Sequence, residues 1–443
     1  MAVWSLLTLD TILMKFYSTR TPQDARSFRE AVLEGLAPDG GLYVPESLPA
    51  LKKEFWDDWL AYSPVQLATR VLAPFVKEDI PEMELADLLA PVVGFPFPLV
   101  EVEPGIHSLE LFHGPTLAFK DVGATFLAQS LGYFARQRDQ QYTVLVATSG
   151  DTGSAVANGF YNVEGTRVII LYPSGKVSAS QEKQLTTYGG NITAVEVNGT
   201  FDDCQRLVKQ SFMDAELKQK LHLTSANSIN LARLLPQSLY YFLGIRQFGV
   251  VPDDLHVCVP SGNFGNITAG LYAQRMGLPI AKFVAATNAN HVVPDYLQSG
   301  TYEPRSSVAT LSNAMDVGAP SNFERLQNLF PLHAQFQAAM TGTHATDEAT
   351  AAAMQEVYDR TGYLLDPHGA VGYLGLKEVL PAGKQGVFLE TAHPAKFQDR
   401  FPAALQDKVE VPDRLAAFLK REKVSVKMEA NDEAFRDFLN AQR

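Results

Sequence analysis

Apolar and polar positions divide the chain into a helical first part and a longer part in which strands and helices alternate. Between residues 27 and 98, apolar residues recur at helical spacing, with glycine and proline at the breaks. Further along, short apolar runs are separated by helical stretches, the longest over residues 231–248, which is typical of a parallel sheet covered on both faces. The predicted strands are residues 142–147, 167–172, 192–197, 255–259, 282–286 and 386–389. The pattern therefore predicts an α/β protein with an N-terminal, mostly helical cap.

Lys120 stands at the predicted start of a helix over residues 121–135, after a Gly-Pro turn and an apolar stretch. Partial burial would disfavour its ammonium form, and the positive end of the helix would act in the same direction. A neutral lysine amine can attack an aldehyde, so Lys120 is a candidate nucleophile. Taken alone, a lysine of this kind is more often a surface residue whose stem packs on the protein while its ammonium group stays in water.

The chain has 443 residues and a formal net charge of −12. This length allows two or three domains. The acidic balance gives no general attraction to nucleic acid or to an anionic membrane, and no apolar span approaches the roughly 20 residues that cross a bilayer. We therefore expect a small-molecule ligand, held by local donors if it is anionic, and neither a nucleic-acid nor a membrane partner.

Cysteine usage and the N-terminal residues bear on the compartment. The two cysteines, Cys204 and Cys258, lie in apolar or amphipathic settings and suit a reducing compartment, so we expect a cytoplasmic protein. No zinc-binding pattern is present, and we expect no metal site.

No Lys or Arg precedes Lys15, so residues 1–13 lack the basic start of a signal peptide. We expect these residues to be a leader outside the fold, either an extension from an upstream start or a frayed segment.

A glycine-containing loop follows the predicted strand at residues 255–259, where a parallel sheet places its ligands. Its glycines let the backbone approach an anion closely, and the next helix adds its positive end. The glycine spacing matches neither the Rossmann nor the Walker pattern, so a dinucleotide or ATP is a poor fit. A plain strand-to-helix turn is the alternative. The candidate phosphate-binding residues are Ser261, Gly262, Asn263, Phe264, Gly265 and Asn266.

A second loop of this kind follows the strand at residues 142–147. Its hydroxyls, carboxylate and free amides could bind a carboxylate or phosphate of a small substrate, or could serve only as a helix N-cap. The candidate residues are Thr148, Ser149, Gly150, Asp151 and Thr152.

Other polar residues could join the same anion sites. Asn227 and Arg233 flank a loop-to-helix boundary, and a guanidinium can bind phosphate through two hydrogen bonds, although a lone helical arginine usually faces solvent. Lys176 could add a point charge. His113 and His368 are more often structural residues than catalysts.

An amine nucleophile, a phosphate loop and a second anion site together fit a pyridoxal-phosphate enzyme. The stretches that carry these groups also resemble the threonine synthase family, and more narrowly its bacterial and fungal branch. The resemblance runs from about Met14 to the C-terminal region. It rests on residues 35–45, 113–121, 148–153, 261–266 and 391–397.

The resemblance implies the tryptophan-synthase-β-like fold of fold type II enzymes, with the cofactor between a large and a smaller, mobile parallel-sheet domain. The expected boundaries are an N-terminal domain at 14–98, a large domain at 99–135 and 233–443, and a smaller domain at 136–232. It also implies that Lys120 forms the Schiff base with pyridoxal 5'-phosphate and that the loop at 261–266 holds the cofactor phosphate.

The remaining roles follow from the same resemblance. Thr391 would give its hydroxyl to the pyridine nitrogen, and Ser149 and its neighbours would bind the substrate. Asn227 and Arg233 would bind the substrate phosphate. Related sulfhydrylases have Asn where this chain has Asp151, and a carboxylate there would repel the cofactor's phenolic oxygen unless one of the two is protonated.

The implied activity is that of a carbon–oxygen lyase acting on phosphates, in threonine biosynthesis. It converts O-phospho-L-homoserine and water to L-threonine and phosphate, and this branch of the family tends to be monomeric. Two alternatives stay open. One is another fold type II enzyme, such as a serine or threonine dehydratase or an O-phosphohomoserine phospho-lyase. The other is a cofactor-binding protein without activity.

Overall fold

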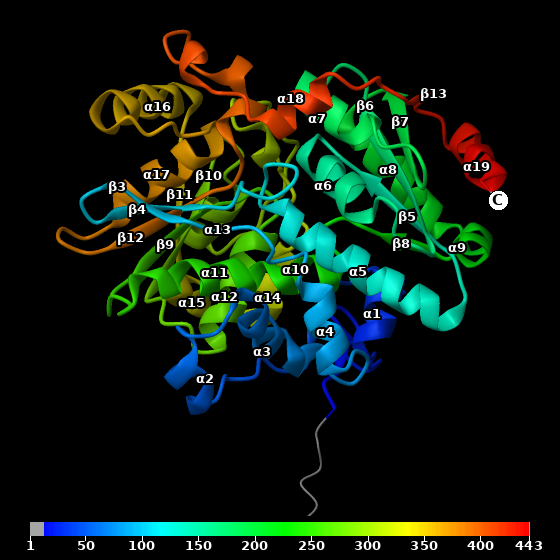
Figure 1. The fold of residues 1–443 in the computed structure, drawn as a ribbon, viewed down its shortest axis with the longest axis horizontal. Coiled ribbons are helices and arrows are strands. Elements are labelled where there is room, and N and C mark those ends of the chain that lie inside the picture. The colour runs from blue at the N-terminus through cyan, green and yellow to red at the C-terminus, as the bar shows by residue number, and fades with distance from the viewer. Residues whose placement is uncertain (1–12, 443) are drawn as a thin grey trace, which may run out of the picture.

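The computed structural model describes residues 13–442, and residues 1–12, which make up nearly all of the expected leader, lie outside the described part. The first region forms a two-stranded antiparallel sheet and a group of helices, which lie below the two larger sheets in Figure 1. Ser27 and Ser63 begin two of these helices with capping boxes. The elements are β1 (Phe16–Ser18), α1 (Phe28–Glu34), β2 (Tyr43–Pro45), α2 (Lys53–Asp58), α3 (Pro64–Val76) and α4 (Glu82–Leu89).

The larger sheet has six strands in the order β11-β10-β9-β12-β4-β3. All neighbours are parallel except β3 and β4, which form a hairpin. The strands are β3 (Leu99–Glu103), β4 (Ile106–Glu110), β9 (His256–Pro260), β10 (Lys282–Thr287), β11 (Met340–His344) and β12 (Gly386–Glu390). The helices of this part are α11 (Ser238–Ile245), α12 (Gly265–Arg275), α13 (Val292–Ser299), α14 (Phe323–Leu329), α15 (His333–Ala339), α16 (Asp347–Thr361) and α17 (Pro367–Val379).

The smaller sheet has five parallel strands in the order β13-β7-β6-β5-β8 and lies to the right of the larger sheet in Figure 1. Its strands are β5 (Tyr142–Ala147), β6 (Thr166–Pro173), β7 (Ile192–Asn198), β8 (Leu223–Ser225) and β13 (Val426–Glu429). Its helices are α6 (Asp151–Phe160), α7 (Ala179–Thr186), α8 (Phe201–Met213) and α9 (Ala215–Leu221). Two layered α/β domains of this kind match the predicted fold class.

The C-terminal segment corrects one expected boundary, because it leaves the larger domain and completes the smaller one. Helix α18 (Asp413–Leu419) contacts α7, β13 pairs with β7, and α19 (Asp432–Ala441) contacts α8. Phe435 and Leu439 are buried in the apolar cluster of the smaller domain. Assigning all of residues 233–443 to the larger domain was therefore wrong. Strand β13 alternates apolar and polar residues, Val-Lys-Met-Glu, but it is only four residues long and mostly exposed, and the sequence analysis did not predict it.

Helix α5 (Lys120–Arg138) connects the parts of the molecule. It contacts α6 of the smaller domain, α1 of the N-terminal region and α10 (Leu231–Leu234). The single helix predicted over residues 231–248 is divided into α10, α11 and two short 3₁₀ turns, with Pro236 at the first break. The sequence pattern also did not predict β3, β4, β8 and β11, which are short or rich in polar residues.

Candidate active site

The predicted site residues gather at the carboxyl ends of parallel strands from both sheets. Lys120 is the first residue of α5, and its neighbour Phe119 donates its backbone N–H to the carbonyl oxygen of Thr391 at 2.9 Å. Thr391 directly follows β12, which pairs with β9, and β9 ends at the phosphate-loop candidate. Parallel strands end at one edge, so Lys120, Thr391 and the loop lie together.

The amine of Lys120 sits in a confined, charged environment. Its side chain is 17% exposed, and Nζ lies 3.8 Å from Oδ2 of Asp151 and 4.9 Å from the ring centroid of Phe119. Burial lowers the pKa of Lys120; the charge of Asp151 opposes this, while the charges of Lys396 and Arg233 add to it. The uncharged, reactive form of the amine is therefore populated at a lower pH here than for a lysine at the protein surface.

Asp151 has partners that the sequence did not reveal. Its Oδ1 lies 2.7 Å from Nζ of Lys396 and accepts a hydrogen bond from Nε2 of Gln181 at 3.0 Å. Burial acts to raise the pKa of Asp151, but the charges of Lys396 and Lys120 outweigh it and hold the pKa below its ordinary value. The carboxylate is therefore ionised, and Lys396 is its closest cation. Lys396 lies in the stretch 391–397 that carried the resemblance, and its only signal was a lysine in an otherwise mostly apolar motif.

The loop at residues 261–266 presents a row of backbone donors. The Ser261 hydroxyl donates to Oδ1 of Asn266 at 2.9 Å, and the Asn266 amide donates to the carbonyl of Pro260 at 2.9 Å. Phe264 adopts a left-handed backbone conformation, with φ of 61°, just before α12 begins at Gly265. Within residues 13–442, the backbone N–H groups of residues 262–266 donate to no protein acceptor. Five free amides at a helix N-terminus suit a phosphate group.

The loop at residues 148–152 is held by its own hydrogen bonds. The Thr148 hydroxyl accepts from the backbone N–H groups of Gly150 at 2.9 Å and Gly153 at 2.8 Å. Gly150 has φ of +138°, and a Cβ atom there would lie 2.3 Å from the Gln181 amide carbon. The loop therefore requires glycine at this position. Thr148 is buried, whereas Ser149 and Thr152 are partly exposed and can reach a ligand.

Arg233 and Asn227 lie beside this loop and beneath α5. The side-chain amide of Asn227 donates to the carbonyl of Ala147 at 3.1 Å. Arg233 is 3% exposed; Nη1 donates to the carbonyl of Ala226 at 2.6 Å, and its buried Nε has no hydrogen-bond partner among the described residues. Burial lowers the pKa of Arg233 to about 10, so it stays cationic at neutral pH. A buried cation with a free donor suits an anionic ligand.

The other candidates are placed differently. Lys176 is exposed on the turn after β6 and forms no ion pair with a described residue. His368 is buried, bonds to Asp366 at the start of α17 and accepts from the backbone of Ala314 at 3.2 Å, which is a structural role. His113 bonds to Glu110 at 2.7 Å.

No group of residues within 13–442 has the composition of a metal site. No helix in that range has the length and apolar character needed to cross a membrane.

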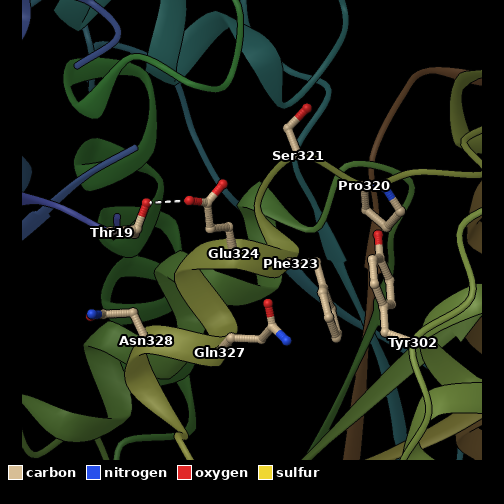
Figure 2. Close-up of a pocket in the computed structure, with 8 residues that line it drawn as sticks. All are labelled: Thr19, Tyr302, Pro320, Ser321, Phe323, Glu324, Gln327 and Asn328. Atoms are coloured by element: carbon tan, nitrogen blue, oxygen red, sulfur yellow. Dashed lines mark hydrogen bonds between the residues drawn. The ribbon is translucent and has the colours of Figure 1, made fainter. Parts of the chain in front are cut away.

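A separate surface pocket of about 560 Å³ lies between the N-terminal region and α14 (Figure 2). The hydroxyl of Thr19 donates to Glu324 at 2.6 Å across it. Its lining contains none of the predicted site residues, although Ser321 in its wall donates to Asn263. The lining residues are Thr19, Tyr302, Pro320, Ser321, Phe323, Glu324, Gln327 and Asn328.

Comparisons with known proteins agree with this geometry. Residues 102–391 match the family described as pyridoxal-phosphate dependent enzyme, residues 15–91 match the threonine synthase N terminus, and residues 369–439 match the C-terminal part of threonine synthase. A threonine synthase of Serratia marcescens is 45% identical over 404 residues, covering 91% of this chain and 94% of that protein.

Solved structures are similar over nearly the whole chain. The crystal structure of threonine synthase from Escherichia coli has a TM-score of 0.90 and 42% identity, covering 97% of this chain and 100% of that one. The crystal structure of PLP-bound threonine synthase from Brucella melitensis has a TM-score of 0.90 and 36% identity, covering 97% and 99%. Two parallel-sheet domains with a buried lysine between them thus define a fold type II pyridoxal-phosphate enzyme. Within this class, the chain belongs to the threonine synthase family.

The described residues fit pyridoxal phosphate. Lys120 offers a mostly buried amine with a lowered pKa for the aldehyde, and the free amides at 262–266, which follow β9 of the larger sheet, offer a phosphate site. The free Nε of Arg233 then remains for a second anion.

Proposed function

We propose that this protein converts O-phospho-L-homoserine and water to L-threonine and phosphate, with pyridoxal phosphate bound at Lys120. The observation that carries the proposal is the mostly buried Lys120 amine, which lies 3.8 Å from Asp151 on a helix whose preceding residue, Phe119, bonds to the backbone of Thr391. The 45% identity to a threonine synthase over 91% of the chain favours this reaction over that of a dehydratase or a protein without activity.

We assign a protein group to the aldehyde, the phosphate and the pyridine nitrogen of the cofactor. Lys120 would hold the aldehyde carbon, the amides of 262–266 would hold the phosphate, and Thr391 would face the pyridine nitrogen with its hydroxyl. The bound cofactor supplies an electron sink for carbanions formed on the substrate. A hydroxyl rather than a carboxylate at the nitrogen leaves the ring less strongly electron-withdrawing, which suits a reaction that moves electrons through several carbons.

The substrate would lie between the two domains. Ser149 and its loop neighbours would bind the carboxylate, and Asn227 and Arg233 would bind the phosphate. Because the Nε of Arg233 has no protein partner, it can stabilise the charge that develops as phosphate leaves. Lys120, once released from the cofactor, would move protons at the substrate carbons as a general base and acid.

Water must enter at one step and be excluded at others, so we propose that the smaller domain closes on the substrate. Residues 148–152 lie on the smaller domain, while Lys120 and Thr391 lie at the edge of the larger one. Lys176, also on the smaller domain, would reach the substrate only in such a closed form.

Replacing Lys120 with Ala tests the proposal directly. The purified wild-type protein should form L-threonine and phosphate from O-phospho-L-homoserine, and the Lys120→Ala variant should lose turnover while keeping its circular dichroism spectrum. Formation of 2-oxobutyrate without threonine would favour the dehydratase or phospho-lyase. Ordinary activity in the variant would refute the role of Lys120.

We further propose a cytoplasmic monomer. Both cysteines are buried and unpaired, which suits a reducing compartment. Light scattering coupled to size-exclusion chromatography measures the mass of the particle, and a value near twice the chain mass of 48.6 kDa would contradict the monomer.

A further inference from the structure

Lys396 is a buried cation that has no direct role in the proposed reaction. It lies in a 3₁₀ turn after β12 (Pro394–Lys396), and its side chain is 0% exposed. Its Nζ makes an ion pair of 2.7 Å with Asp151 and donates to the carbonyl of Thr116 at 2.9 Å. The ion pair joins a segment of the larger domain to the first residue of α6 in the smaller domain.

The position of this pair matters because Asp151 also faces Lys120. The carboxylate lies 2.7 Å from Lys396 through Oδ1 and 3.8 Å from Lys120 through Oδ2. Coulomb attraction grows as distance falls, so the closer lysine is the main partner of the carboxylate. The charged groups that act on Lys120 are Asp151, Lys396, Arg233 and Asp366.

Without Lys396, a buried carboxylate would have Lys120 as its nearest cation. Such a pair would favour the ammonium form of Lys120, which cannot attack an aldehyde. Stability alone does not explain the Lys396–Asp151 pair, because a buried ion pair often contributes no more than apolar residues of equal volume.

We infer that Lys396 is a positioning residue: by occupying Oδ1 of Asp151 and adding a positive charge near Lys120, it keeps the Lys120 amine uncharged and able to react with the cofactor aldehyde. The inference rests on the proposed function, since it concerns Lys120 as the cofactor-binding amine. Lys396 would act through Asp151, whose carboxylate contacts both lysines.

Four variants of the full-length chain test this inference: Lys396→Gln, Asp151→Asn, the double variant, and Lys396→Arg. After removal of bound cofactor, the rate of pyridoxal phosphate uptake is followed by visible absorbance between pH 6 and 10. The uptake step joins the Lys120 nitrogen to the aldehyde carbon with loss of water, so its pH midpoint reports the fraction of uncharged amine.

The signs of the expected shifts differ between variants. Lys396→Gln should raise the midpoint by about one pH unit or more, because an unpaired carboxylate then faces Lys120. Asp151→Asn should lower it, because Lys396 remains without its anion. The double variant removes both charges and should return close to the wild-type midpoint, and Lys396→Arg should keep it.

The outcomes separate this inference from the proposed function. If Lys120→Ala forms the same visible band as wild type, the cofactor assignment of Lys120 fails. If the wild-type band depends on Lys120 but Lys396→Gln leaves the midpoint unchanged, the role of Lys396 is overturned and the proposed function stands. If Lys396→Gln does not fold, the comparison of Asp151→Asn with the double variant decides: the double variant should have the higher midpoint, and equal midpoints would overturn the role of Lys396.

Discussion

Two buried arginines of this protein have opposite surroundings. Arg325 on α14 is 0% exposed and donates to the carbonyls of Tyr43, Ser228 and Ile229 and to the side chain of Asn322. Arg233 on α10 is 3% exposed, donates to the carbonyl of Ala226 and leaves its Nε without a partner among the described residues.

Burial lowers the pKa of both arginines to about 10, so both carry a charge at neutral pH. The two guanidinium groups differ in their hydrogen-bond partners. Arg325 donates to backbone carbonyls from two parts of the chain, at Tyr43 and at residues 228–229, which holds the N-terminal region against α14. Arg233 keeps its Nε without a partner among the described residues, near the loop at residues 148–152. A buried cation with satisfied donors stabilises a fold, and one with a free donor is suited to bind an anion.

The largest expected effect is on the free energy of unfolding, which replacement of Arg325 should lower much more than replacement of Arg233. Arg325→Ala leaves three backbone carbonyls and Asn322 without their donor and opens a cavity, so it should lower the free energy of unfolding by about 3–5 kcal/mol. Urea denaturation followed by circular dichroism measures this change. Arg233→Ala is the matched control; an equal loss of stability in that variant would break the comparison.

The next effect concerns activity. Arg233→Ala should lower kcat/KM for O-phospho-L-homoserine by about 10²–10³-fold, because a donor to the developing phosphate charge is lost. Steady-state phosphate release measures it, and Arg325→Ala should change the kcat/KM of the folded protein far less. Wild-type kinetics in Arg233→Ala would contradict the phosphate-site assignment.

A smaller effect concerns Asp121, whose charge acts on Arg233. Burial raises the pKa of Asp121 from 3.8 to about 6, against hydrogen bonds from Thr116. Because the folded pKa exceeds the unfolded value, the protonated acid contributes stability below about pH 4, and this is lost as pH rises through 6. The shift corresponds to at most about 3 kcal/mol. Asp121→Asn should flatten the fall in unfolding free energy between pH 4 and 6; an unchanged slope would show that Asp121 titrates normally.

Much of the fold, and the position of the candidate site at strand ends, could be predicted from local patterns. The strands at 142–147 and 282–286 have long apolar runs bounded by loops, and the structure has strands there, each starting at the predicted residue. Lys120 lies at the start of a helix and is mostly buried, and residues 261–266 lie between a strand and a helix, as predicted. Their roles in binding and catalysis stay predictions. Strand β11 (Met340–His344) was missed, because its Met-Thr-Gly-Thr-His sequence has no strand pattern.

The sequence by itself determined the alternation of strands and helices, the lysine at a helix start and the glycine loops at strand ends. These depend on spacing between neighbouring residues, which a linear chain displays directly. Only the tertiary structure decided that Lys396 pairs with Asp151, that β13 joins the smaller sheet, and that Arg233 keeps a free donor while Arg325 does not. Those features depend on contacts between residues far apart in the chain, because burial and electrostatic pairing exist only once the chain has folded.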